Sequence, residues 1–201
     1  MKRIRFYIQT DKLPTLLLFG VGVLLGIFGV YIGREFFLAN SEILREDILY
    51  HLKYVNVDCK AFFYYVVKER VGQALILAVL SSTYLGIVLC AGTALGYGVS
   101  MGVFLATAVL RYGLKGVILI VVCAFPHYAL YIPMLFALLV WCERLCRGIY
   151  FQRNFHVEKG TAILREADLP RLFIILGIIL VGCFLESFLN PYLLSAYLKI
   201  F

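Results

Sequence analysis

Several residue patterns in this sequence have the types and spacing that chemistry requires, and the first is a possible nucleophile. The segment Gly98-Val99-Ser100-Met101-Gly102 matches the G-x-S-x-G pattern of serine hydrolases, whose serine sits on a sharp strand-to-helix turn near a histidine and an acid. His127 and Glu186, in other segments, could complete such a triad. The pattern lies in an apolar stretch, however, and its small residues make chance matches common. We therefore predict that the protein is not an enzyme.

Two pairs of side chains have the spacing of metal ligands. Cys123 and His127 are four residues apart, as are Cys142 and Cys146, so each pair could share one face of a helix. No second compact pair supports either of them, and Pro126 interrupts the first. We predict no metal and no cofactor. Lipid attachment is an alternative use for Cys142 and Cys146.

Glu186 is an acid inside an apolar stretch, where a buried charge is costly unless it faces a partner or a cavity, or holds a proton. Asn190 and Pro191 follow within about one turn, and the proline removes a backbone hydrogen bond. Ser187 or Asn190 could satisfy the freed carbonyl groups. Two interpretations stay open here: a structural bend with a hydrogen-bonded glutamate, or a partner or ion site.

A second irregular segment surrounds His127. Pro126 and Pro133 are seven residues apart, which argues against a straight helix and favours a kinked or re-entrant segment. His127 would lie where this helix opens. A hydrogen-bonded structural role is the preferred interpretation, with catalysis as the alternative.

Long apolar stretches must position these residues. No Asp, Glu, Lys or Arg occurs in 13–33, 71–110, 116–142 or 172–185. Because about 20 apolar residues cross a bilayer as a helix, the stretch 71–110 must cross twice. A hydrophobic content of 63% and a mean hydropathy of +0.92 agree with lipid as the main solvent. We predict an all-α polytopic integral membrane helical bundle, one domain over 1–201, with about five transmembrane helices, at about 13–33, 71–89, 92–110, 116–142 and 170–198.

Charge at the chain's start predicts the orientation. Lys2, Arg3, Arg5 and Lys12 precede the first apolar stretch, so the N-terminus is expected in the cytoplasm. Alternation then places 34–70 outside, as amphipathic helices broken near Asn56–Asp58, and 143–169 in the cytoplasm. The net charge of +7 is spread between the spans, which indicates contact with membrane lipids and no nucleic acid.

Glycines four residues apart predict close helix packing, because they let helix backbones approach in lipid. The pairs are Gly22/Gly26, Gly29/Gly33, Gly92/Gly96 and Gly98/Gly102. Contacts within the chain are the preferred interpretation, and a homo-oligomer stays possible.

The order of several short motifs resembles the stage II sporulation protein M family. These motifs are Gly113-Leu114-Lys115-Gly116-Val117-Ile118-Leu119, then Phe125-Pro126-His127 and Tyr131-Ile132-Pro133, and finally Leu185-Glu186-Ser187-Phe188-Leu189-Asn190-Pro191. His127 stands where many relatives carry Gln, and Asn190 where Thr is common; both changes preserve hydrogen bonding. A basic N-terminus and one early span followed by a polar segment also fit this family.

This resemblance implies a non-enzymatic membrane anchor in the septal and engulfing membrane of the mother cell. Such an anchor recruits two peptidoglycan-degrading enzymes, stage II sporulation proteins P and D, during engulfment of the forespore. Partner helices would pack on the glycine seams, and Phe36 to Arg70 would present an outer docking face. The alternative is a small membrane transporter or permease with a polar site at the broken helices, since such helices form substrate sites in transporters.

Overall fold

The computed structural model describes residues 2–35, 58–125, 127–150 and 168–200, and within these ranges every regular element is a helix. The helices are α1 (Lys2–Ile32), α4 (Cys59–Leu80), α5 (Gly86–Tyr112), α6 (Leu114–Ala124), α7 (His127–Tyr150), α8 (Asp168–Phe184), a π-helical turn η3 (Leu185–Leu189) and α9 (Asn190–Ile200). The predicted all-α bundle is therefore confirmed.

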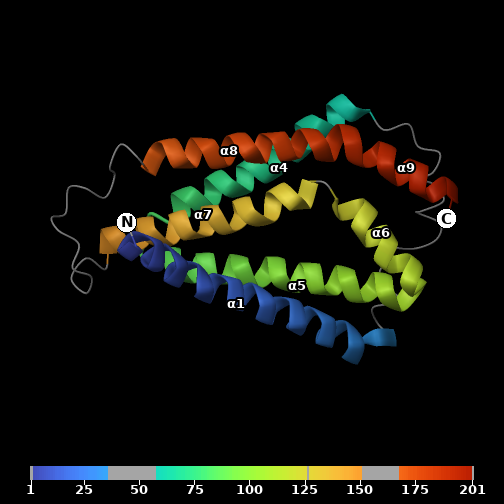
Figure 1. Cartoon of the computed structure of the whole chain (residues 1–201), viewed down its shortest axis with the longest axis horizontal. Coiled ribbons are helices and arrows are strands. Elements are labelled where there is room, and N and C mark those ends of the chain that lie inside the picture. Colours follow the sequence, from blue (N-terminus) through green and yellow to red (C-terminus); the bar gives the residue numbers. More distant parts are fainter. Residues whose placement is uncertain (1, 36–57, 126, 151–167, 201) are drawn as a thin grey trace.

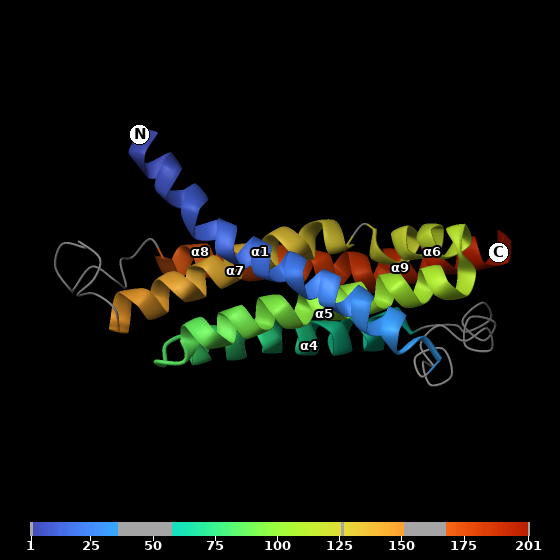
Figure 2. The same cartoon turned by 90° about the horizontal axis from the view of Figure 1, so that it is seen from below.

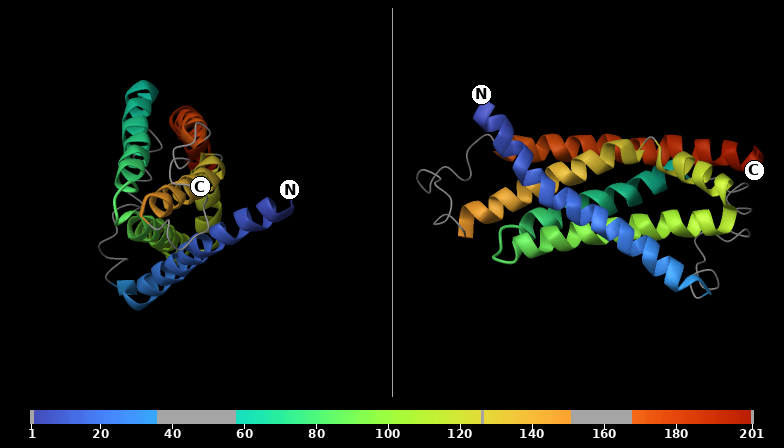
Figure 3. Two further views of the ribbon diagram at one scale, coloured as in Figure 1. Left: turned by 90° about the vertical axis from the view of Figure 1, so that its left-hand side faces the viewer. Right: turned by 60° about the horizontal axis from the view of Figure 1, so that its bottom comes forward.

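The long helices lie side by side, and each runs opposite to the long helix before it in the chain, so that α1 and α5 run in the same direction (Figures 1 and 2). Seen along the bundle, α7 lies centrally between α4, α5 and α8, while α1 crosses obliquely over the outside of α5 (Figure 3). The described start and end of the chain lie at opposite ends of the bundle (Figure 1). The main apolar core joins α4, α5, α7 and α8 around Leu77, Cys90, Leu139 and Ile179.

Four helical segments in the described ranges are long and apolar enough to cross a membrane: Pro14–Ile32, Gly86–Tyr112, His127–Arg147 and Leu169–Tyr197. Three of them match the predicted spans 13–33, 92–110 and 170–198. The helix α4 is the other full-length helix of the bundle, but it carries Lys68, Glu69 and Arg70 near its centre.

The predicted span 71–89 is wrong. The chain turns at 81–85, so this range covers the end of α4, the turn and the start of α5. The hydroxyl groups of Ser81, Ser82 and Thr83 each donate to the carbonyl three residues earlier, at 2.6–2.7 Å. Three consecutive hydroxyl side chains thus end α4, and with Tyr84 they form the most polar run of the uncharged stretch 71–110.

The predicted boundary of the outer segment at Arg70 is also wrong. Asp58 begins α4, because its carboxylate accepts hydrogen bonds from the backbone N–H of Lys60 at 3.0 Å and of Ala61 at 3.4 Å. From there α4 continues without interruption to Leu80. Likewise α7 extends to Tyr150, beyond the predicted boundary at 143. The remaining parts of these two predicted segments, 36–57 and 151–167, lie outside the described residues.

The predicted span 116–142 is two helices. Gly113 has φ = 56°, a conformation that other residues rarely adopt, and it reverses the chain from α5 into α6. Phe125 is extended (φ −87°, ψ 138°) and separates α6 from α7. The break that the two prolines predict is therefore present, although Pro126 itself lies outside the described residues. Pro133 is an exposed residue inside α7.

Glycines join α1 to α5. A methyl group on Gly22, Gly26, Gly98 or Gly102 would collide with backbone atoms of the facing helix, so these residues permit direct backbone contact. The prediction of seams within the chain is confirmed for these two pairs. Gly29, Gly92 and Gly96 face open space instead, with no atom within 4 Å of an added methyl group.

Candidate functional site

The π-helical turn at Leu185–Leu189 places Glu186 on the inner side of the bundle. The backbone N–H of Asn190 bonds to the carbonyl of Leu185, five residues earlier, and Pro191 has no N–H to offer. The wider turn accommodates the proline without ending the helix, so the predicted irregularity at Glu186, Asn190 and Pro191 is a widened turn within one long helix. Such turns often occur at functional sites.

Glu186 is held by two side chains from other helices. The hydroxyl of Tyr131 on α7 donates to Glu186 Oε2 at 2.8 Å, and Arg70 Nη2 on α4 lies 3.6 Å from Glu186 Oε1. The Glu186 side chain is 14% exposed and the Arg70 side chain 28% exposed, so both are partly buried. This pairing is what permits two charges at this depth.

The ring of Tyr131 organises this cluster. It packs so closely on α8 that a methyl group at Gly182 would lie 2.5 Å from Tyr131 Cε1. The guanidinium carbon of Arg70 lies 5.2 Å from the centre of the same ring, in cation–π contact. Four elements therefore meet at this cluster: α8 at Gly182, α7 at Tyr131, α4 at Arg70 and η3 at Glu186.

Three buried polar atoms next to this cluster have no hydrogen-bond partner among the described residues: His127 Nδ1, Ser187 Oγ and Asn190 Oδ1. His127 is 2% exposed and Ser187 is fully buried. The predicted hydrogen bond of His127 is not found at Nδ1. The Ser187 hydroxyl does not donate to a backbone carbonyl group, contrary to the prediction near Pro191. Instead the His127 ring packs on Tyr128 and Tyr131, with centroids 4.9 and 5.8 Å away.

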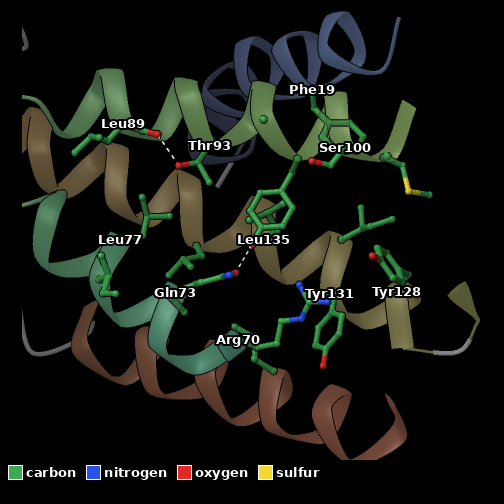
Figure 4. Close-up of a pocket in the computed structure, with 18 of the residues that line it drawn as sticks. Phe19, Arg70, Gln73, Leu77, Leu89, Thr93, Ser100, Tyr128, Tyr131 and Leu135 are labelled. Carbon is green, nitrogen blue, oxygen red and sulfur yellow. Dashed lines mark hydrogen bonds between the residues drawn. The ribbon is translucent and has the colours of Figure 1, made fainter. Parts of the chain in front are cut away.

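A cavity of about 570 Å³ opens beside the cluster, between α4, α5 and α7. Arg70, Gln73, Tyr97, Tyr128 and Tyr131 line its polar part, and Leu77, Leu80, Leu89, Leu135 and Leu138 line much of the rest (Figure 4). The hydroxyl of Tyr97 donates to Gln73 Oε1 at 2.7 Å and links α5 to α4 across this space. Gly96 and Ser100 also lie on its wall.

The structure gives no support to the hydrolase pattern. Residues 98–102 are continuous helix in α5, without the strand-to-helix turn that positions a nucleophile, and Gly98 and Gly102 are occupied by the contact with α1. Cys142 and Cys146 are fully buried, and Cys146 Sγ lies 3.3 Å from the carbonyl oxygen of Thr83. In the described ranges no group of three or more His, Cys, Asp or Glu residues is suited to a metal ion.

The sequence indicated Glu186, His127 and Asn190, but it did not indicate that Arg70 is the partner of Glu186. The expected outer segment ends at Arg70, because Arg70 is the last charged residue before the uncharged stretch 71–110. The available signal was the helical spacing of Phe62, Phe63, Val66 and Val67, which continues into the apolar stretch after residue 70. A continuous helix across Lys68-Glu69-Arg70 predicts that Arg70 lies inside the bundle.

The fold and the cluster define a polytopic helical membrane protein with a charged pair in the middle of its bundle. A family model described as "Stage II sporulation protein M" matches residues 15–191. The chain belongs to this family, which makes it a membrane protein of a sporulation-related family. No curated protein and no solved structure matches it.

Proposed function

We propose that this protein is a membrane anchor without catalytic activity, which recruits peptidoglycan-degrading enzymes to the septal membrane during engulfment. The proposed partners are stage II sporulation proteins P and D, and the proposed orientation has the N-terminus in the cytoplasm. Family membership supports this role. The hydrolase pattern also lies in a helical setting that does not suit a nucleophile.

The observation that carries the proposal is the difference among the glycine pairs. Gly22, Gly26, Gly98 and Gly102 are used within the chain, whereas Gly92 and Gly96 are exposed on one face of α5, where Gly96 also lies on the wall of the cavity. Because membrane helices associate through close packing at small residues, this face can accept the transmembrane helix of another protein. Val88, one turn earlier and 66% exposed, extends the same face.

Co-purification from detergent tests the proposal. We expect a Gly92→Leu, Gly96→Leu variant to lose recovery of the proposed partner enzymes, because two leucines keep a partner helix's backbone away. Gly29→Leu is the matched control, since Gly29 also faces open space but lies on α1. Unchanged recovery with a double variant that still folds and inserts would contradict docking on α5, and no recovery with the unaltered protein would contradict the anchor role.

A transporter remains the second candidate because of one specific arrangement. The break between α6 and α7 and the π-helical turn η3 bring His127, Ser187 and Asn190, each with an unpartnered buried atom, next to a charged pair. Interrupted helices around polar groups at mid-membrane form the substrate sites of many transporters. Solute uptake by proteoliposomes that contain this protein alone would favour transport. Absence of uptake together with tight binding of the partner enzymes would favour the anchor.

A further inference from the structure

The cavity beside Arg70 has its polar part near the middle of the bundle's length. Tyr97, which bonds to Gln73, lies near the centre of α5 (Gly86–Tyr112), and Arg70 is one turn from Gln73 on α4. Glu186 likewise lies near the centre of the segment Leu169–Tyr197. Arg70 therefore lies level with the centres of two helices that are long and apolar enough to cross a membrane, while its neighbours Lys68 and Glu69 on α4 are exposed.

Arg70 has more hydrogen-bond donors than its contacts in the structure use. A guanidinium has five N–H donors, yet within the described part of the chain Arg70 has only a 3.6 Å contact with Glu186 and the face of Tyr131. The Arg70 side chain is partly exposed and borders the cavity, so a ligand with an acceptor group in the cavity can bond to the remaining donors. The cavity onto which Arg70 opens supplies the space for one.

The remaining walls specify the rest of this ligand. From Arg70 the cavity continues past Leu77 and Leu135 to Leu80, Leu89 and Leu138, all of them aliphatic. Leu80 and Leu89 flank the turn at 81–85, so the apolar part runs from mid-membrane toward that end of the bundle. About 570 Å³ lies in the range of small-molecule pockets, and it is too small to enclose a helix about 10 Å across.

We infer that this cavity binds a single-chain lipid with a carboxyl head group, such as a long-chain fatty acid. The carboxyl group lies at Arg70 in the middle of the membrane, and the chain points toward the turn at 81–85. A phospholipid does not fit this arrangement, because its permanently charged head group stays at the membrane surface. A fatty acid can reach Arg70 because it crosses the hydrocarbon as a neutral acid.

The charge balance favours the protonated acid. Arg70 and Glu186 already neutralise each other, so a ligand that keeps its proton adds no net charge. Its carbonyl oxygen accepts from Arg70, and its O–H donates to Gln73 Oε1, which accepts one hydrogen bond from Tyr97 and has a second lone pair. This assignment goes beyond the proposed anchor role and does not depend on it.

Trp141 provides the test, because it is the chain's one tryptophan and lies on α7, about one turn beyond Leu138 of the cavity's apolar wall. It follows Tyr131 by about 15 Å of helix, which is half the thickness of the hydrocarbon core, about 30 Å. Trp141 is thus near the membrane boundary. A free fatty acid in the bilayer has its carboxyl group near Trp141, whereas a bound one has its methyl end there.

The experiment uses the whole chain in phosphatidylcholine vesicles and fatty acids labelled with a nitroxide quencher. We expect saturable quenching of Trp141 that is stronger with the nitroxide near the methyl end than near the carboxyl group. Unlabelled fatty acid should displace the probe, and the methyl ester should bind more weakly. The opposite order of quenching without saturation would overturn the site, and equal binding of acid and ester would overturn the assignment of the carboxyl group.

Variants of Arg70 separate a bound head group from a loss of folding. Arg70→Gln should weaken binding of the acid by about tenfold, as expected for loss of a charge-assisted hydrogen bond. Because that change leaves Glu186 without its countercharge, a second variant combines Arg70→Gln with Glu186→Gln, which removes both charges together. Arg70→Lys should retain part of the affinity. Unchanged binding in the double variant would overturn the role of Arg70.

Discussion

At the scale of residues, the protein places two opposite charges and a phenol where lipid surrounds most side chains. Tyr131 and Arg70 each contact a different oxygen of Glu186, and Gly182 makes room for the tyrosine ring. Neither charge would be stable here alone, since an unpaired buried charge is far more costly than a paired one. The cluster therefore holds α4, α7 and η3 in one relative position.

Removing the Tyr131 hydroxyl should measure this effect. We expect Tyr131→Phe to lower the free energy of unfolding by about 1 kcal/mol, the size typical of one hydrogen bond. Thermal unfolding in detergent is the measurement. Tyr192→Phe is the matched control, because Tyr192 is 74% exposed and has no hydrogen bond among the described residues. Equal melting temperatures for both variants would show that the bond to Glu186 contributes nothing.

At the scale of elements, α1 and α5 are joined by backbone contact through glycines of both helices. Gly26 and Gly102 illustrate the geometry, because an added methyl group at either would meet backbone carbonyl groups of the partner helix. Backbone atoms cannot rotate away as the end of a side chain can. The contact consequently depends on the absence of a side chain rather than on which side chains surround it.

A substitution at this contact should separate α1 from α5. We expect Gly102→Ala to destabilise the protein by about 1–3 kcal/mol, the cost of overpacking a tight contact. Gly96→Ala, on the same helix but facing open space, is the control and should stay within about 0.5 kcal/mol of the unaltered protein. Melting temperatures in detergent measure both. A similar loss at Gly96 would mean that α5 tolerates no added methyl group for reasons unrelated to α1.

At the scale of the whole molecule, side-chain contacts show which connections share an end of the bundle. Tyr150, at the end of α7, donates to the carbonyl of Ser82 at 3.1 Å, and its ring packs on Tyr84 at 5.9 Å. Tyr197, at the other end, donates to the carbonyl of Lys115 at 3.3 Å. The turn at 81–85 therefore lies with the end of α7, and the α5–α6 turn lies with α9.

This arrangement predicts the outcome of reporter fusions. With the N-terminus in the cytoplasm, a fluorescent reporter that folds only in the cytoplasm should be active after Tyr150. Alkaline phosphatase, which needs an oxidising compartment, should be active at the C-terminus, since α8 to α9 crosses to the far end of the bundle (Figure 1). Activity of the same reporter at both positions would contradict the passage of α8, η3 and α9 across the membrane.

The sequence by itself determined that the protein is a helical membrane bundle, where its chain is irregular and to which family it belongs. Stretches free of charge require helices in lipid, because only internal hydrogen bonds can satisfy the backbone there. Proline positions likewise indicated the break before α7 and the irregular turn at Glu186, because proline lacks the N–H that a regular helix needs. These are local properties of the chain.

Only the tertiary structure decided which helices meet and which polar groups are paired. The absence of charge along 71–110 gave no boundary at the turn 81–85, and the charges at 68–70 gave no indication that Arg70 contacts Glu186 inside the bundle. Four glycine pairs look alike in sequence, yet Gly22/Gly26 and Gly98/Gly102 contact each other while Gly92 and Gly96 stay open. Which face of a helix meets another depends on residues distant in sequence, and so does the contact of Arg70 with Glu186.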